Sequence, residues 1–126
     1  MGIRLPVGVG VFLTTSLAAT LASCASASTC PAVAWSGIAV VVQDATNGAS
    51  ICDATVTLRD GSYVETATAI GGCSYAGAFE RSGTYDIEVS KVGFRTAAAH
   101  GVVVTKDTNT CPHVVGKSVV IALAPM

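Results

Sequence analysis

The chain carries few charged side chains. Lys, Arg, Asp and Glu make up 12% of its 126 residues, and the formal net charge is −1. A nucleic-acid-binding protein concentrates positive charge on one face, and this sequence contains no basic cluster that would do so. It also lacks an acidic run of the kind that forms an interaction tail. The sequence therefore predicts no nucleic-acid partner.

Catalytic motifs are missing as well. The chain has no G-x-S-x-G nucleophile elbow, no H-E-x-x-H pair and no P-loop. Ser74 comes soon after Gly71 and Gly72, which are better explained as a turn between strands than as the setting of a nucleophile. The chain has two histidines, His100 and His113, but it contains no C-x-x-C repeat of the kind found with histidine in zinc sites. We expect a protein that is not an enzyme and that holds no metal or cofactor.

Two pairs of carboxylates have simple structural explanations. Asp86 and Glu88 lie two residues apart on a predicted strand, so they share one face, which favours a solvated surface over acid–base chemistry. Asp44 and Asp53 flank a predicted turn and are potential calcium ligands, but aspartate is also a standard turn residue. Neither pair is predicted to be a functional site.

The N-terminal residues have the pattern of a secretory signal peptide. Residues 1–6 contain Arg4 and no acid, and residues 7–22 form an uncharged run rich in small residues. The alternative is a retained transmembrane helix, which needs about 20 strongly apolar residues. This run is shorter and is diluted by Gly8 and Gly10. We therefore expect export with removal of the signal segment.

The run ends in "LASC", residues 21–24, which resembles the lipobox of bacterial lipoproteins. The resemblance implies cleavage before Cys24 and a diacylglyceryl and palmitate-type lipid anchor on its thiol. Ala25 after the anchor favours the outer membrane in a cell with two membranes. The alternative is ordinary secretion with cleavage after Ala27 in an A-x-A pattern, which would discard Cys24. The expected organisation is a signal peptide (1–23), a tether (24–34) and one domain (35–126).

The rest of the chain has the period-two hydrophobic pattern of strands. In "TYDIEVSK", Tyr85, Ile87 and Val89 alternate with polar residues, and no window has an amphipathic helical pattern. Turn signals such as Asn47-Gly48 separate the strands. The pattern predicts a seven-stranded, antiparallel-type β-sandwich with strands at residues 37–44, 54–60, 63–69, 74–80, 84–91, 99–105 and 117–125.

Two segments, "QDATNGASICDATVTLRD" and "ERSGTYDIEVSKVGF", carry a family resemblance. They resemble the carboxypeptidase regulatory-like domain, a transthyretin-like (prealbumin-like) sandwich, over residues 36–125. The matching positions are core and turn residues, such as Gly83-Thr84-Tyr85 and Gly93-Phe94. The resemblance implies an accessory module without catalytic residues of its own. The chain departs from the pattern at Gly71-Gly72-Cys73 and in its extra cysteines.

Four cysteines remain after Cys24: Cys30, Cys52, Cys73 and Cys111. An even number favours disulfides in an oxidising compartment, and four cysteines allow three pairings. If the strands alternate up and down, Cys52 and Cys73 arrive at one end of the domain and Cys30 and Cys111 at the other. Bridged Cα atoms must lie within about 7 Å, so the prediction is Cys52–Cys73 and Cys30–Cys111.

These features together predict a lipoprotein of the cell envelope, held by lipid on Cys24, with a non-catalytic structural or protein-binding domain. Its partner is an unidentified envelope protein or polysaccharide. A carbohydrate- or peptidoglycan-binding module would instead require an exposed aromatic pair on one sheet, for which Trp35 and Tyr63 are the candidates. A small enzyme or metal-binding envelope protein would require His100 and His113 to converge with a carboxylate.

Overall fold

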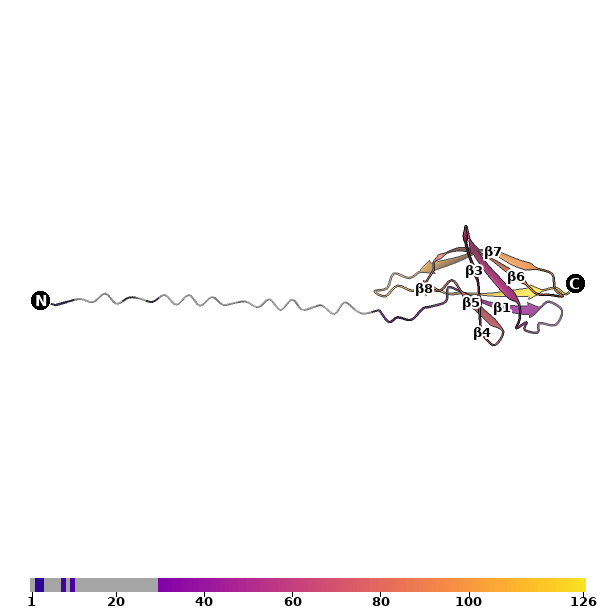
Figure 1. Ribbon diagram of the computed structural model, residues 1–126, viewed down its shortest axis with the longest axis horizontal. Helices are drawn as coiled ribbons and strands as arrows, with labels where there is room; N and C mark the ends of the chain where they lie inside the picture. The colour runs from indigo at the N-terminus through magenta and orange to yellow at the C-terminus, as the bar shows by residue number, and fades with distance from the viewer. Residues whose placement is uncertain (1, 4–7, 9, 11–29) are drawn as a thin grey trace.

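The structure of the protein is a computed structural model that describes residues 2–3, 8, 10 and 30–126. None of these residues is helical, and nine strands form two sheets (Figure 1), so the predicted all-β class is confirmed. In chain order the strands are β1 (Ile38–Asp44), β2 (Thr55–Asp60), β3 (Tyr63–Thr66), β4 (Thr68–Gly71), β5 (Ser74–Gly77), β6 (Gly83–Ser90), β7 (Ala97–Lys106), β8 (Val114–Val115) and β9 (Lys117–Leu123).

The core lies between the two sheets and is made by the inward residues of alternating strands. In β6, Tyr85, Ile87 and Val89 are fully buried, while the residues between them are exposed. Leu58 of β2 and Val40 of β1 join the same cluster from the two sheets. Burying each such side chain contributes roughly 1.5–3 kcal/mol, which makes this cluster the main source of stability. The arrangement is sandwich-like.

The pairing of the strands departs in one place from the prediction. One sheet has the order β4-β5-β1-β9 and the other the order β3-β2-β6-β7-β8. Neighbouring strands are antiparallel except for β1 and β9, which are parallel. The expectation of an antiparallel-type sandwich is therefore wrong for this pair. Both strands begin at the end of the domain that contains Cys30 and run towards the opposite end. They are therefore parallel where they pair.

Two strand segments pass from one sheet to the other. Residues 63–69 were expected to form one strand, but β3 pairs with β2 in one sheet and β4 pairs with β5 in the other. Between them lies the buried Ala67, whose N–H donates to the carbonyl of Val56. In the same way β8 and β9 are separated only by Gly116 and belong to different sheets. The division of residues 63–69 gives one strand more than the sequence predicts, and the two-residue β8, which lies outside the predicted strands, gives the other.

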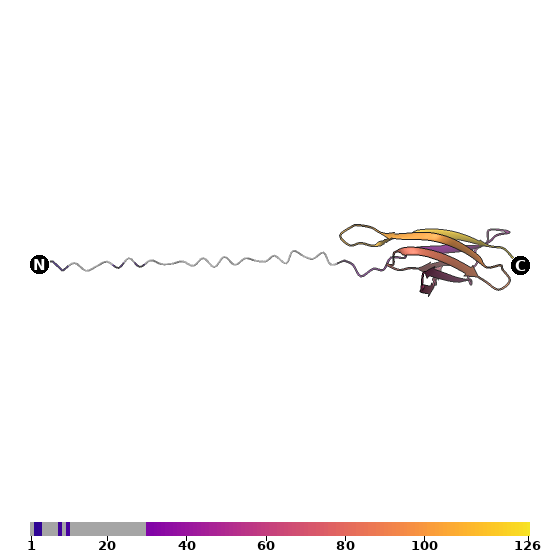
Figure 2. The same ribbon diagram turned by 90° about the horizontal axis from the view of Figure 1, so that it is seen from above.

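The strands run between two ends of the domain (Figure 2). We call the end where β1, β6 and β9 begin the proximal end; it comprises residues 30–37, 78–82 and 107–116. The distal end comprises residues 45–54, 71–73, 91–96 and 124–126. The C-terminus lies at the distal end, away from residue 30, where the N-terminal segment joins the domain (Figure 1).

A disulfide lies at each end. Cys30 and Cys111 are joined at the proximal end, with Cα atoms 5.3 Å apart, and Cys52 and Cys73 at the distal end, with Cα atoms 4.1 Å apart. These are the two pairs that alternating strand directions predict. Dividing residues 63–69 between two strands does not disturb the alternation of direction. β3 and β4 run in the same direction, from the proximal to the distal end, as the single predicted strand would.

Candidate functional site

The most elaborate group of polar and aromatic side chains lies at the proximal end. The ring of Trp35 stacks on the imidazole of His113, with centroids 4.6 Å apart and planes within 10°. Nδ1 of His113 lies 2.6 Å from Oε1 of Glu80. Three segments distant in sequence therefore meet: the entry to β1, the turn from β5 to β6 and the segment before β8.

Glu80 links these segments. Its Oε1 accepts a hydrogen bond from the backbone N–H of Trp35 at 2.8 Å, and its own N–H donates to the Trp35 carbonyl at 2.9 Å. The hydrogen bond to His113, and then the one from Trp35, lower the pKa of the Glu80 carboxyl below its ordinary value. The carboxylate is therefore held in its ionised form as the connecting group of the cluster.

The turn that carries Glu80 has an uncommon backbone. Ala78 and Glu80 have φ values of 53° and 51°, in the left-handed region that residues other than glycine seldom occupy. The turn is fixed from several sides, because Ala78 N–H donates to Oε1 of Glu65 at 2.6 Å and its carbonyl accepts from Gly37 at 3.1 Å. Gly37 has to be glycine here, since a Cβ would lie 2.6 Å from that carbonyl oxygen.

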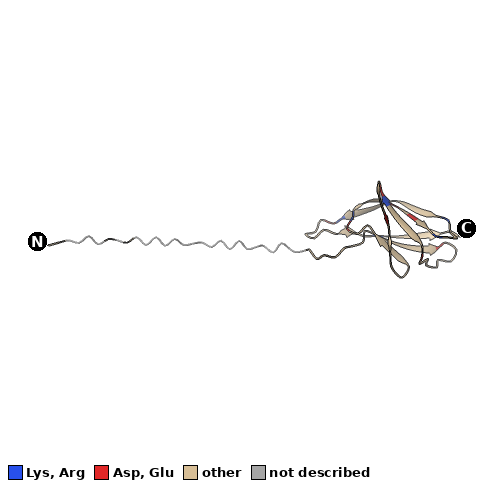
Figure 3. Ribbon diagram, in the orientation of Figure 1, with Lys and Arg blue, Asp and Glu red and all other residues tan. Residues whose placement is uncertain are grey.

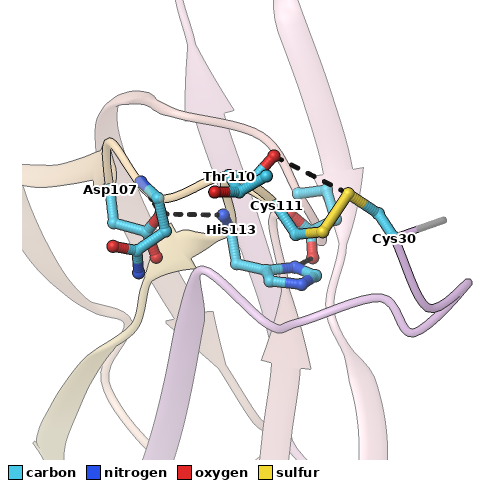
Figure 4. Close-up of a disulfide and its surroundings, with 7 residues drawn as sticks. Cys30, Asp107, Thr110, Cys111 and His113 are labelled. Carbon is cyan, nitrogen blue, oxygen red and sulfur yellow. Dashed lines mark hydrogen bonds and ion pairs between the residues drawn. A yellow bond between two sulfur atoms is a disulfide. The ribbon is translucent and has the colours of Figure 1, made fainter. Parts of the chain in front are cut away.

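The disulfide at the proximal end adjoins this cluster (Figure 4). Cys111 lies two residues before His113, and the Sγ of Cys30 lies 3.8 Å from the carbonyl oxygen of Thr110. Asp107 closes the loop, because its carboxylate accepts from the N–H of Asn109 at 3.1 Å and its N–H donates to the His113 carbonyl at 2.9 Å. The N-terminal segment is thus covalently fixed where Trp35 and His113 stack.

The chemistry available to this cluster is limited. His113 and Glu80 form one acid–base pair, and its imidazole is covered on one face by Trp35. Within residues 30–126 there is no group of three or more His, Cys, Asp or Glu side chains that could hold a metal ion. The same part of the chain forms no pocket. The contacts of the cluster join three segments of the chain and leave Trp35 exposed.

A second cluster surrounds Arg81. Its guanidinium carbon lies 3.7 Å from the centroid of the Tyr63 ring, and Nη1 donates to Asp60 and to the Tyr85 hydroxyl, each at 2.9 Å. The Tyr85 hydroxyl donates in turn to the Arg81 carbonyl. The hydrogen bond with Tyr85, and then that with Asp60, raise the pKa of Arg81. This cluster fastens the β2–β3 hairpin to the start of β6.

Three of the four carboxylates considered from the sequence, all except Glu88, have separate partners. Asp44 accepts from the N–H of Thr46 at 2.8 Å, and hydrogen bonds from the Thr46 side chain and backbone lower its pKa. Asp53 pairs with Lys91, which lowers the Asp53 pKa by its hydrogen bond and charge. Asp86 lies 3.3 Å from Nδ1 of His100.

The two histidines therefore lie against different carboxylates on different elements. His100 is on β7, beside Asp86 of β6, whereas His113 is at the proximal end beside Glu80. The aromatic residues of the strands give no outward pair in the described part of the chain either: Tyr75 and Tyr85 are buried, and Tyr63 lies under Arg81. Trp35 and Phe79 are exposed, but both lie outside the strands, at the proximal end.

The outer faces of the two sheets differ in charge. In Figure 3 the coloured segments are sparse, and most of the ribbon is tan. The five-stranded sheet has outward charged or titratable residues at Arg59, Asp86, Glu88 and His100. On β1 and β9 of the other sheet, every outward residue is uncharged: Ala39, Val41, Gln43, Ser118, Val120 and Ala122. These six residues form what we call the uncharged face.

The predicted lipidation site, Cys24, lies outside the described residues, as do "LASC" and most of the signal segment. The described part of the chain contains no helix with the length and hydrophobicity of a membrane span. No model of a known protein family matches the chain, and no curated protein matches it. The resemblance of residues 36–125 to carboxypeptidase regulatory-like domains therefore stays a prediction.

Sequence reasoning missed both side-chain clusters. It considered Trp35 as a candidate for an exposed aromatic pair and His113 as a potential metal ligand, and did not pair the two. Glu80 and Arg81 were treated as part of a strand and its flanking turn. The local signal for the second cluster was present in "ERSGTY", where Arg81 precedes the inward Tyr85 by four residues.

Proposed function

We propose that the protein is an exported lipoprotein whose domain serves as a non-catalytic structural or protein-binding module of the cell envelope. Lipid on Cys24 holds it at the cell membrane or the outer membrane. Its domain is a transthyretin-like β-sandwich of the carboxypeptidase regulatory-like type. The module role comes from the resemblance of residues 36–125 to accessory domains that present edges and loops for contact.

One observation carries the proposal. All four cysteines after residue 24 are used in disulfides, and the first of them, Cys30, is tied to the proximal end of the domain. Disulfides persist in oxidising compartments outside the cytosol, and a signal peptide directs a chain to such a compartment. Cys24 remains as the one cysteine outside these pairs, at the position that "LASC" gives to the lipid-bearing residue.

Replacing the anchor tests the proposal. The wild-type protein should partition into the detergent phase and incorporate an alkyne analogue of palmitate, whereas Cys24→Ser should stay in the aqueous phase without label. Ser26→Ala is the matched control, because it changes the same short segment and leaves the thiol in place. A mature N-terminus at Ser28, without lipid, would contradict the anchor and favour ordinary secretion.

The uncharged face supports a role in contact with another protein. Val120 is 63% exposed and lies beside Val41 on the neighbouring strand, in a surface whose desolvation costs little because it holds no charge. A photoreactive amino acid in place of Val120 should give a crosslinked product in intact cells. The same group at Glu88, on the charged face of the other sheet, should not. Crosslinks from Glu88 alone would contradict this assignment.

A further inference from the structure

The proximal end carries the exposed aromatic side chains of the described residues. Trp35 is 52% exposed and Phe79 is 45% exposed. Phe79 directly precedes Glu80, whose backbone N–H donates to the carbonyl of Trp35. Val33 and Val115, 58% and 45% exposed, lie at the same end. The distal end also exposes apolar side chains, Val92 and Met126, but no strongly exposed aromatic ring. The two ends therefore differ in the chemistry that they present.

Chain length decides which end faces a bilayer that holds Cys24. From Cys24 to Cys30 the chain makes six Cα-to-Cα steps, which span at most about 22 Å when fully extended. Because the disulfide to Cys111 fixes Cys30 to the proximal end, residues after Cys30 cannot detach from the domain to lengthen the tether. The ten residues of β7 extend over about 33 Å, so the tether is too short for the distal end to reach the bilayer with the proximal end pointing away.

Two positive side chains near the proximal end also suit a lipid surface. Glu80 is engaged by His113 and Trp35, and Asp107 by backbone N–H groups of its own loop. Lys106 and Lys117 are exposed and form no ion pair with any of residues 30–126. These two positive side chains lie close to the tether, and positive side chains are attracted to anionic headgroups.

We propose that the proximal end is a lipid-contacting surface in which Trp35 and Phe79 lie at the headgroup level of the bilayer that carries the anchor. Tryptophan favours this region because its ring is amphipathic. The stack on His113 holds the Trp35 ring in place, so little side-chain freedom is lost on contact. The assignment rests on the proposed lipid anchor and adds a second, non-covalent contact that orients the domain.

Trp35 is the only tryptophan of the chain, so its fluorescence reports on this contact directly. The lipidated full-length product is purified from membranes and reconstituted into vesicles of phosphatidylethanolamine and phosphatidylglycerol. Some vesicles carry lipids brominated close to the headgroup. The emission of Trp35 should shift to the blue relative to soluble Cys24→Ser protein and should lose most of its intensity in the brominated vesicles.

A matched variant moves the fluorophore to the other end. In Trp35→Phe combined with Val92→Trp, the tryptophan occupies a distal position that is 98% exposed, and its emission should be unaffected by bromine. Flotation of the vesicles tests the anchor separately. Protein that floats with unquenched Trp35 overturns the lipid-contacting surface alone and leaves the proximal end free for a protein partner. Protein that does not float overturns the anchor and this surface together.

Discussion

The two disulfides should contribute to stability in the order opposite to their loop lengths. In the loop-closure model a disulfide acts by restricting the unfolded chain, and the sequence separations are 81 for Cys30–Cys111 and 21 for Cys52–Cys73. The model then gives about 4.5 kcal/mol for the first and about 3.3 kcal/mol for the second. That ranking assumes that each reduced protein keeps the native fold unchanged.

The structure makes that assumption poor for Cys30. Residues 30–34 are all exposed, and the first strong contacts of the segment are those of Trp35. Without the disulfide these five residues regain freedom in the folded state, and backbone freedom is worth about 1 kcal/mol or more per residue. This gain in the entropy of the folded state offsets several kcal/mol of the stabilisation that the loop-closure model gives. We expect a net contribution of less than about 2 kcal/mol from Cys30–Cys111.

Cys52 is held differently. Its neighbour Ile51 is buried and donates to the carbonyl of Val42, and the N–H of Ala54 donates to the Tyr75 hydroxyl. Cys73 lies directly before β5. Breaking this disulfide frees little of the folded chain, so most of the loop term should survive, at about 3 kcal/mol.

Urea unfolding followed by circular dichroism measures both contributions in the Cys24→Ser background, where lipid and a free thiol are absent. The variants are Cys30→Ser with Cys111→Ser and Cys52→Ser with Cys73→Ser. The second should lower the free energy of unfolding more than the first, and the slope should rise in both variants because the unfolded chain becomes less compact. A larger loss in the Cys30 and Cys111 variant would refute the reasoning about the freed segment.

Two further perturbations examine the proximal end. Because the pKa of Glu80 is lowered in the fold, its ionised form adds stability above the ordinary carboxyl range that is lost as pH falls. Melting temperatures measured between about pH 5 and about pH 3 should therefore fall more for wild type than for Glu80→Gln; equal slopes would contradict this. Gly37→Ala should destabilise by about 1–3 kcal/mol in urea, because its Cβ would meet the Ala78 carbonyl. Gly116→Ala, whose Cβ would lie 3.1 Å from Ser36 O, should cost less, and the reverse order would argue against the tight approach at Gly37.

The extent of what the sequence could predict follows from the range of each signal. The alternation of Tyr85, Ile87 and Val89 is local, so it identified β6 and its buried face. Successive strands that reverse direction place their connections at alternate ends, which is why the cysteine pairs could be predicted. The alternation of apolar and polar residues indicates which face a residue occupies but not which strand lies beside it. The parallel pairing of β1 and β9 therefore could not be predicted from it.

The sheet crossing at Ala67 and the proximal cluster failed for different reasons. Through residues 63–67 the period-two pattern continues without interruption, because Ala67 stays inward where the strand changes sheet. The cluster depends on contacts between residues far apart in sequence, such as Trp35 and His113, whose stack no local pattern encodes. A family pattern built from core and turn positions does not reveal it either.

The crossings have a consequence for a domain held at a membrane. A long free edge strand invites pairing with another chain, and anchored copies meet at high local concentration. Here the edges on one side are β3 and β4, of only four residues each, because a single segment is divided between the sheets. On the other side the edge strands are longer: β9 has seven residues, and β7 has ten, of which only Thr105 and Lys106 pair with β8. The short edges of the domain therefore lie on one side only. If the domain is anchored as proposed, the proximal end faces the bilayer, and contact with partners then falls to the uncharged face rather than to strand addition at β3 or β4.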